Sequence, residues 1–471
     1  MFRTIAAVAV ALAVMPVAAV AQPAATEEQS RESDLFAEDD GAPKPAAPAP
    51  ATPGVAATPA PATDDPGDLG DARMVGQAEE NTALLRDRTQ LGGMFYLRNA
   101  LQWNEDTDVS DQRLSQSTLV DLYLDARVND RVRAYLRGRT VYNPLADTAA
   151  TSPMAGLLGA KASADEVSVL LDQAWLKFDI ARRVFLTLGK QQVRWGTTRM
   201  WNPVDVINPT RRDPLTFFDE RQGLPMVKIH VPFENGWNGY LLALTDDAAK
   251  LDQPGVASRI EYVVESAEIG LVGAVRKGQD PKVGLDLSAG VGDFDVTGEL
   301  GTVFVGDSVE WQASAGVNWT WAYAEDDSLT LGVEYFHNAQ GAGDDAGVVS
   351  AGAAAIVAGK PWPYQPFYTG TDYAAVLAAL ISPGSWSDAV VSFIGLTNLS
   401  DGSALGRLSL QGRVLTDLSL EGYVSAPVGE GEFTGYTREI RKQFGPMATL
   451  IGAELPTRQV ATVGLNLRVD M

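Results

Sequence analysis

The feature that most constrains the fold is an alternation of apolar and polar residues with a period of two, which starts near Leu91. In Leu119–Val128, valine, leucine and alanine occupy one set of alternate positions, whereas aspartate, tyrosine and arginine occupy the other. Trp311–Trp321 and Arg407–Val414 repeat the pattern. Because successive side chains of a β-strand point to opposite faces, this period predicts strands with one apolar and one polar face.

The number of these strands favours a membrane barrel over a soluble β-sandwich or β-helix, whose strands also alternate. About 16–18 long strands follow one another with no convincing helix between them. A sheet in lipid cannot leave its edges unpaired, so it must close on itself. We therefore predict an all-β fold, a transmembrane antiparallel β-barrel of about 16–18 strands.

Aromatic residues gather near the ends of the predicted strands. We expect them to form girdles at the two membrane interfaces, as in other membrane barrels. The set comprises Phe95, Tyr96, Trp103, Trp175, Phe178, Trp195, Trp237, Tyr240, Tyr335 and Phe336.

The chain ends in a strand of the same kind, Gln459–Met471. Its apolar face carries Ala461, Val463, Leu465, Leu467, Val469 and Met471. In this respect it resembles the closing strand of outer-membrane barrels, which commonly ends in an aromatic residue that the barrel-assembly machinery reads. The resemblance therefore implies that the barrel-assembly machinery is a partner of this chain. The chain departs from the pattern at its last residue, since Met471 stands on the apolar face where an aromatic residue is common.

The N-terminal part has a different character. Residues 1–21 have a basic start, an apolar run and a small-x-small end, which predict a signal peptide. Residues 22–70 are acidic and then rich in proline and alanine, and they predict a disordered linker that could recruit a periplasmic partner. We expect a short helical lead-in at 71–90 and the barrel over 91–471.

Composition excludes several classes of function. The formal net charge of −23 disfavours nucleic acid as a partner, because phosphate binding needs clustered Lys and Arg. The absence of cysteine excludes a lipoprotein anchor and disulfides. The sequence contains no phosphate-binding, dinucleotide or zinc motif, so we predict no cofactor and no metal site.

The long connections predict which end of the barrel faces outwards. If the first strand is about Leu91–Trp103, the predicted loops all follow odd-numbered strands. These loops are Asn143–Glu166, Thr197–Gly223, Asp246–Ala257 and Asn338–Ser385. They would lie outside the cell if the N-terminus is periplasmic. The segment Pro427–Lys442 breaks this parity, which indicates an error in the strand count after Asn338.

Charged residues on the polar faces of two neighbouring strands are the first candidates for a site. They are Asp121, Asp125, Arg127, Arg131, Arg133, Arg137 and Arg139. One interpretation is a lumen wall that selects solutes by charge. The other is a structural network in which the charges neutralise one another across the strands. Both require an inward face, since an arginine in lipid is costly.

The segment Gly189–Val227 is the most distinctive one. It contains Gly189-Lys190-Gln191, Trp195-Gly196 and Ile207-Asn208-Pro209, followed by a return strand. This order resembles a recurring signature of large bacterial porin-like outer-membrane proteins, many of them functionally uncharacterised. The resemblance implies the class of protein and leaves the solute open.

We expect the loop Thr197–Gly223 to fold into the barrel and narrow the pore, because it follows the predicted fifth strand and its prolines restrict the backbone. General porins fold a loop inwards at this place. In this hypothesis Arg194, Arg211, Arg212 and Glu220 line the constriction. The alternative is an external cap held by ion pairs among the same residues.

The predicted function is a porin-like channel for the passive or semi-selective passage of small solutes across the outer membrane. One alternative is a non-conducting structural or export component. The other is an outer-membrane hydrolase, for which His230 and His337 are the only histidines in the chain. We predict that the protein is not an enzyme.

Overall fold

The computed structural model describes residues 88–145, 166–208, 210–215, 220–233, 235–246, 254–324, 327–358, 365–451 and 457–471. The described residues form eighteen β-strands in one sheet. The first nine are β1 (Thr89–Asn104), β2 (Arg113–Asn129), β3 (Val132–Tyr142), β4 (Val167–Ile180), β5 (Val184–Gln191), β6 (Leu224–Pro232), β7 (Trp237–Leu244), β8 (Gly255–Val264) and β9 (Ala267–Val275). The other nine are β10 (Lys282–Val291), β11 (Phe294–Val305), β12 (Ser308–Ala322), β13 (Ser328–Asn338), β14 (Asp372–Ile381), β15 (Ala389–Asn398), β16 (Ser403–Leu415), β17 (Leu418–Val428) and β18 (Gln459–Asp470).

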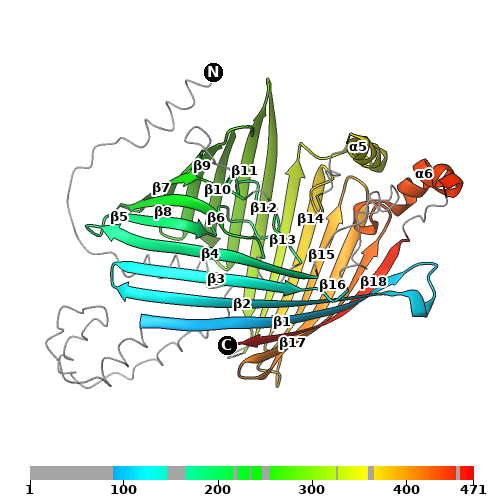
Figure 1. Ribbon diagram of the computed structural model, residues 1–471, viewed down its shortest axis with the longest axis horizontal. Coiled ribbons are helices and arrows are strands. Elements are labelled where there is room, and N and C mark those ends of the chain that lie inside the picture. The colour runs from blue at the N-terminus through cyan, green and yellow to red at the C-terminus, as the bar shows by residue number, and fades with distance from the viewer. Residues whose placement is uncertain are drawn as a thin grey trace.

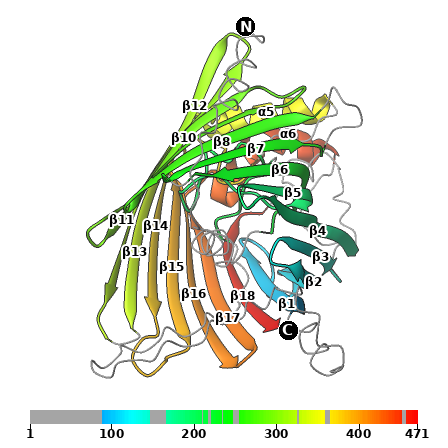
Figure 2. The same ribbon diagram turned by 90° about the vertical axis from the view of Figure 1, so that its left-hand side faces the viewer.

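The sheet closes into a barrel (Figures 1 and 2). Each strand pairs antiparallel with its neighbours in the sequence, and β18 pairs antiparallel with β1. Met94 lies opposite Asp470, and the backbone groups of Gly93 and Met471 exchange two hydrogen bonds of 3.0 and 2.8 Å. The C-terminal strand therefore closes the barrel up to its last residue, and the predicted fold class is confirmed.

The barrel wall is apolar on its outer face and charged on its inner face, whereas a water-soluble protein is polar outside and apolar inside. Apolar side chains of the predicted outer face are exposed, with Leu122 at 54% and Leu465 at 57%. Charged side chains of the other face are buried, including Asp121, Asp125 and Asp286. The exposed apolar side chains suit lipid and the buried charged ones face the lumen, which is the arrangement of a transmembrane barrel.

The turns at the end of the barrel where β1 begins and β18 ends are short, whereas the long connections, together with the short β11–β12 turn, lie at the other end. The long connections follow β3, β5, β7, β13 and β17. The connection after β13 contains α5 (Asp345–Val357), and the one after β17 contains η4 (Glu432–Thr434) and α6 (Thr437–Ile451). The β1–β2 connection contains η2 (Val109–Asp111). Within the described part of the chain, no helix is long and apolar enough to cross a membrane.

The predicted loop Asn338–Ser385 is wrong, because it contains the strand β14. Counting this strand makes Pro427–Lys442 the end of β17 and the connection after it, so this connection also follows an odd-numbered strand. The strand escaped notice because its inward face carries Tyr373, Ala375 and Leu377, all buried against other apolar side chains. A strand that is apolar on both faces shows no alternation.

Two further expectations need correction. Strand β1 begins at Thr89, two residues before the expected start. Not all the aromatic residues belong to interfacial girdles, since Tyr96, Trp195 and Phe336 are buried and Trp175 stacks on Tyr135. The expected signal peptide and linker, and the lead-in up to residue 87, lie outside the described residues.

Candidate functional site

The described residues of the connection between β5 and β6, 192–208, 210–215 and 220–223, lie inside the barrel. Its first part packs on the inner wall of β6–β9, where Val193, Trp195, Val204, Val206 and Ile207 contact apolar side chains of the strands. Its Met200 and Trp201 pack on a second apolar cluster, formed with residues of β13–β15 and of the loop before β14. The inner walls are apolar where the loop covers them, so the loop is part of the packed interior.

The carboxylate of Glu299, on β11, is the first polar anchor of the loop. It accepts hydrogen bonds from the backbone N–H groups of Thr197 at 2.6 Å, Thr198 at 2.7 Å and Val204 at 3.1 Å. The Thr198 hydroxyl and the Asn202 amide also donate to it, at 2.7 and 3.2 Å. Glu299 is 4% exposed, so nearly all of its solvation has been replaced by these donors.

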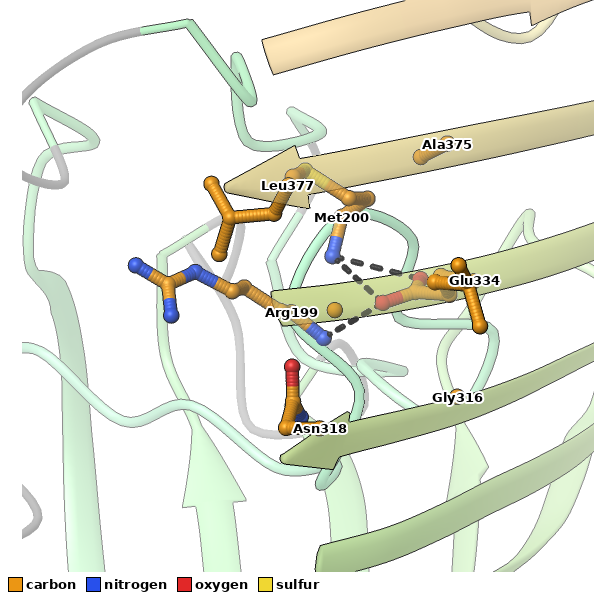
Figure 3. A pocket seen from close by; sticks show the side chains of 9 residues that line it. Arg199, Met200, Gly316, Asn318, Glu334, Ala375 and Leu377 are labelled. Atoms are coloured by element: carbon orange, nitrogen blue, oxygen red, sulfur yellow. Dashed lines mark hydrogen bonds between the residues drawn. The ribbon is translucent and has the colours of Figure 1, made fainter. Parts of the chain in front are cut away.

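The carboxylate of Glu334, on β13, is the second anchor (Figure 3). The N–H groups of Arg199, Met200 and Trp201 donate to it at 2.9–3.2 Å, and so does the hydroxyl of Ser314 at 3.0 Å. Figure 3 shows the Arg199 side chain pointing away from this carboxylate, and Arg199 is exposed. Five consecutive residues of the loop thus donate their N–H groups to two carboxylates of the wall.

Gly196 is required at the start of the anchored segment. Its φ of +112° is a conformation that other residues rarely adopt, and a Cβ atom there would lie 2.6 Å from a carboxylate oxygen of Glu299. Gly301 of β11 allows a similar approach, since a Cβ atom at that position would lie 2.5 Å from the carbonyl oxygen of Pro203. These two glycines let the loop backbone lie directly against the wall.

The return part of the loop crosses to the opposite wall. Arg407 of β16 donates to the carbonyl of Leu215 at 3.2 Å. Glu220 pairs with Arg98 of β1 at 2.6 Å, and Arg139 of β3 donates to its carbonyl at 2.7 Å. The loop is also tied to itself by an ion pair of 2.7 Å between Arg221 and Asp205. It therefore contacts the wall on both sides of the lumen.

The predicted charged ladder forms a paired network on β2–β4. Asp121 accepts from Arg137 at 2.5 Å and from Arg139 at 2.9 Å, and Asp172 of β4 lies 3.3 Å from Arg139. Arg139, Asp121 and Asp172 are at most 3% exposed in their side chains. With Arg98 and Glu220 included, three arginines face three carboxylates, so this level of the wall is balanced in charge.

The other ladder residues lie nearer to the short-turn end and are more exposed. Arg133 pairs with Asp125 at 2.7 Å, and Arg127 lies 3.9 Å from the same carboxylate. Arg131 stands in the turn before β3 and pairs with Asp179 at 3.0 Å. The structure thus divides the ladder into a buried set around Asp121 and a set nearer the rim, in which the arginines are exposed and Asp125 is buried.

The predicted constriction residues occupy different places. Arg211 donates to the carbonyl of Asn202 and to the side chain of Gln312, and it stacks over the ring of Tyr368. Arg194 lies 3.5 Å from the carbonyl of Thr198. Arg212 is half-buried in the loop, and Glu220 reaches the wall. Their role in lining a constriction remains a prediction.

Several lumen charges were missed by the sequence reasoning. They are Arg98, Asp172, Glu299, Glu334, Arg407 and Glu421, together with Arg259, which contacts Glu261, Glu268 and Asp286 on β8–β10. A charged residue at an inward position of an alternating strand indicates a lumen charge. Arg98 and Arg407 both stand at such positions. The β4 residue Asp172 gave a weaker signal because the β3–β4 register shifts beside it.

The two histidines have aromatic and acidic neighbours. His230 is buried and stacks on Tyr240 with ring centroids 4.3 Å apart. His337 stacks on Trp311, and its Nδ1 lies 2.9 Å from the Asp372 carboxylate.

A second group of buried polar residues joins the loops at the outer mouth. Glu432, which is 1% exposed, accepts from the N–H of Phe367 at 2.6 Å, the hydroxyl of Tyr373 at 2.7 Å and the amide of Asn398 at 2.9 Å. Burial raises the pKa of Glu432 to about 7, although these hydrogen bonds act in the opposite direction. The carboxylate links the β13–β14 and β17–β18 connections.

This contact should depend on pH. The pKa of Glu432 is higher in the docked loops than its ordinary value of 4.5, so the docked state binds the proton more tightly. The resulting stabilisation is complete below about pH 4.5 and is lost as the pH rises through about 7. We expect higher hydrogen-exchange protection factors for the Phe367 and Thr434 amides at pH 5.5 than at pH 8. In Glu432→Gln the difference should vanish, and an equal difference in that variant would contradict the assignment.

No protein-family model and no curated protein matches the chain. Among solved structures, the chain is similar to a triple mutant of the Rh. blastica porin, with 12% identity, coverage of 81% of this chain and 100% of that one, and a TM-score of 0.41. It is also similar to OccAB1 of Acinetobacter baumannii, with 9% identity, coverage of 82% and 97%, and a TM-score of 0.48. The Gly189–Val227 signature remains a prediction.

The closed sheet with an apolar outer face places the protein in the bacterial outer membrane. Lipid requires that every backbone N–H and C=O be satisfied within the protein, and the β1–β18 pairing achieves this for the sheet. In outer-membrane barrels the short turns face the periplasm and the longer loops face outwards, so we expect the short-turn end to be periplasmic.

Proposed function

We propose that the protein is a porin-like channel through which small solutes cross the outer membrane, with residues 192–223 setting the width of the passage. The supporting observation is the position of this loop, which is bonded to Glu299 and Glu334 on one side and to Arg98 and Arg407 on the other. A loop held by buried hydrogen bonds on one side and by partly buried contacts on the other would keep a constant opening, as a size filter requires.

The charge balance of the β1–β4 wall bears on selectivity. Asp121, Asp172 and Glu220 face an equal number of arginines, so a solute at this level meets paired charges. We therefore propose that size, rather than the sign of the charge, decides passage at this level. Exposed Arg199, near Glu334, is a cation that a passing anion could contact.

Shortening the loop should widen the passage. Deletion of 209–219 removes Arg211 and Leu215, which contact Asn202 and Arg407, so we expect a larger single-channel conductance in planar bilayers than for the intact chain. Deletion of 346–356, equal in length and confined to α5, should leave conductance unchanged. Equal conductance of the intact chain and the 209–219 deletion would contradict the proposal.

The single-channel conductance also distinguishes a channel from a non-conducting protein. An intact chain that does not conduct, together with a conducting deletion, would identify the loop as a plug and favour a structural or export component. The roles of the barrel-assembly machinery in reading β18, and of a periplasmic partner in binding the linker, remain predictions.

A further inference from the structure

A basic surface lies at the periplasmic rim, where β1, β2, β3 and β4 are neighbours (Figure 1). We call it the basic rim and define it by Arg88, Arg127, Arg131, Arg133, Arg182 and Arg183. The aspartates among these residues are Asp125, Asp130 and Asp179. Six arginines against three aspartates leave an excess of three positive charges.

The rest of this end of the barrel has the opposite charge. Its other short turns carry Glu265, Asp293, Asp327, Asp388 and Asp417, of which Asp388 is paired with Arg413. The whole chain has a formal net charge of −23. The basic rim is therefore a local exception on an acidic protein, and it is the part of the short-turn end that attracts an acidic segment.

The arginines of the rim are accessible to another acidic group. The Arg182 side chain is 71% exposed and the Arg127 side chain is 59% exposed. Arg127 is also 3.9 Å from Asp125, at the limit of an ion pair. The Arg182–Asp130 pair is open, with side chains 71% and 35% exposed. Such an exposed pair contributes only about 0–1 kcal/mol, so Arg182 can exchange its carboxylate for another at little cost.

The chain itself supplies a matching segment. Residues 27–40 contain seven acidic residues and one basic residue, Arg31. The described chain starts at Arg88, whose guanidinium donates to the carbonyl of Val128 at 3.2 Å, so the N-terminal segment joins the barrel at the basic rim. Treated as a random coil, a segment of the length of 41–87 would span roughly 35–40 Å, which would keep the acidic run near the rim at an effective concentration on the order of millimolar.

We propose that the basic rim is the docking site of the acidic run 27–40 of the same chain. The contact is electrostatic and would hold negative charge beside the periplasmic mouth of the barrel. Because it depends on exposed charges, it should weaken as the Debye length falls from about 10 Å at 0.1 M salt to about 3 Å at 1 M.

Pairs of spin labels test this proposal in the full chain, which contains no cysteine to remove. One label is placed at Ala37→Cys and the other at Val128→Cys beside the rim, or at Leu415→Cys as the control at the same end of the barrel. At 0.05 M salt we expect a short, populated distance only for the 37–128 pair. That distance should be lost at 1 M salt and in the triple variant Arg127→Glu, Arg182→Glu and Arg183→Glu.

Two matched variants complete the test. Replacing the acids of 27–40 by their amides should abolish the short distance, whereas Asp64→Asn with Asp65→Asn should preserve it. Equal distance distributions for the two label pairs, or insensitivity to salt, would overturn the proposal. It would also fail if the rim variant kept the 37–128 distance but bound less phosphatidylglycerol in vesicles, because the rim would then be a lipid site.

Discussion

Replacing both Glu299 and Glu334 by alanine is expected to detach the loop between β5 and β6 from the wall. The two carboxylates accept hydrogen bonds from the N–H groups of Thr197, Thr198, Arg199, Met200 and Trp201. A buried donor that loses its acceptor costs about 1–3 kcal/mol, so losing either anchor should cost on the order of 3 kcal/mol or more. The apolar contacts of Trp201 and Val204 alone should not hold the backbone in one position.

Two measurements follow the detachment. Single-channel conductance should become larger and noisier, because the loop no longer holds a fixed opening. Trypsin should cleave after Arg199, whose following residues Met200 and Trp201 are buried in the native protein. Glu310→Ala is the control: it removes a β12 carboxylate that contacts Gln340. Native conductance and trypsin resistance in the double variant would show that other contacts hold the loop.

Replacing Asp121 by asparagine is expected to destabilise the barrel strongly. The Asp121 carboxylate accepts from both Arg137 and Arg139, whose side chains are 11% and 3% exposed. The amide keeps the shape of the carboxylate and removes its charge, so of the two aspartates that face these guanidinium groups only Asp172 still carries a negative charge. Breaking a buried ion pair by removing one partner costs about 3–5 kcal/mol.

The free energy of unfolding in urea, measured in lipid vesicles, provides the test. Asp388→Asn is the matched control, since its pair with Arg413 lies at the rim with both side chains at least half exposed. That substitution should cost about 0–1 kcal/mol. We also expect Asp121→Asn to shift the ion selectivity of the channel towards anions. Equal losses in the two variants would show that the Asp121 network contributes no more than a surface pair.

The sequence by itself determined the membrane barrel and most of its wall. The period of two placed Leu122 outwards and Asp121 inwards, because a strand alternates its faces and lipid accepts only one of these side chains. The alternation failed at β14, whose inner face is covered by the loop and its neighbours. The alternation is missing from β14 because lipid on one face of the strand and the packed interior on the other are both apolar.

The charged lumen was only partly predictable. The sequence showed that Asp121, Arg137 and Arg139 face inwards, and it left open which acid neutralises which base. Only the tertiary structure decided this, since Asp172 and Glu220 reach the same arginines from β4 and from the loop. Such partners lie far apart in the sequence, and a period of two contains no information on which strands become neighbours across a lumen.

The position of the loop was likewise decided by the tertiary structure alone. Its prolines and charges were compatible with an external cap as well as with a segment inside the barrel. Its anchors, Glu299 and Glu334, lie about a hundred residues or more further along the chain, on β11 and β13. Local sequence fixes which backbone groups need acceptors, whereas closure of the barrel brings the two carboxylates within hydrogen-bonding distance of them.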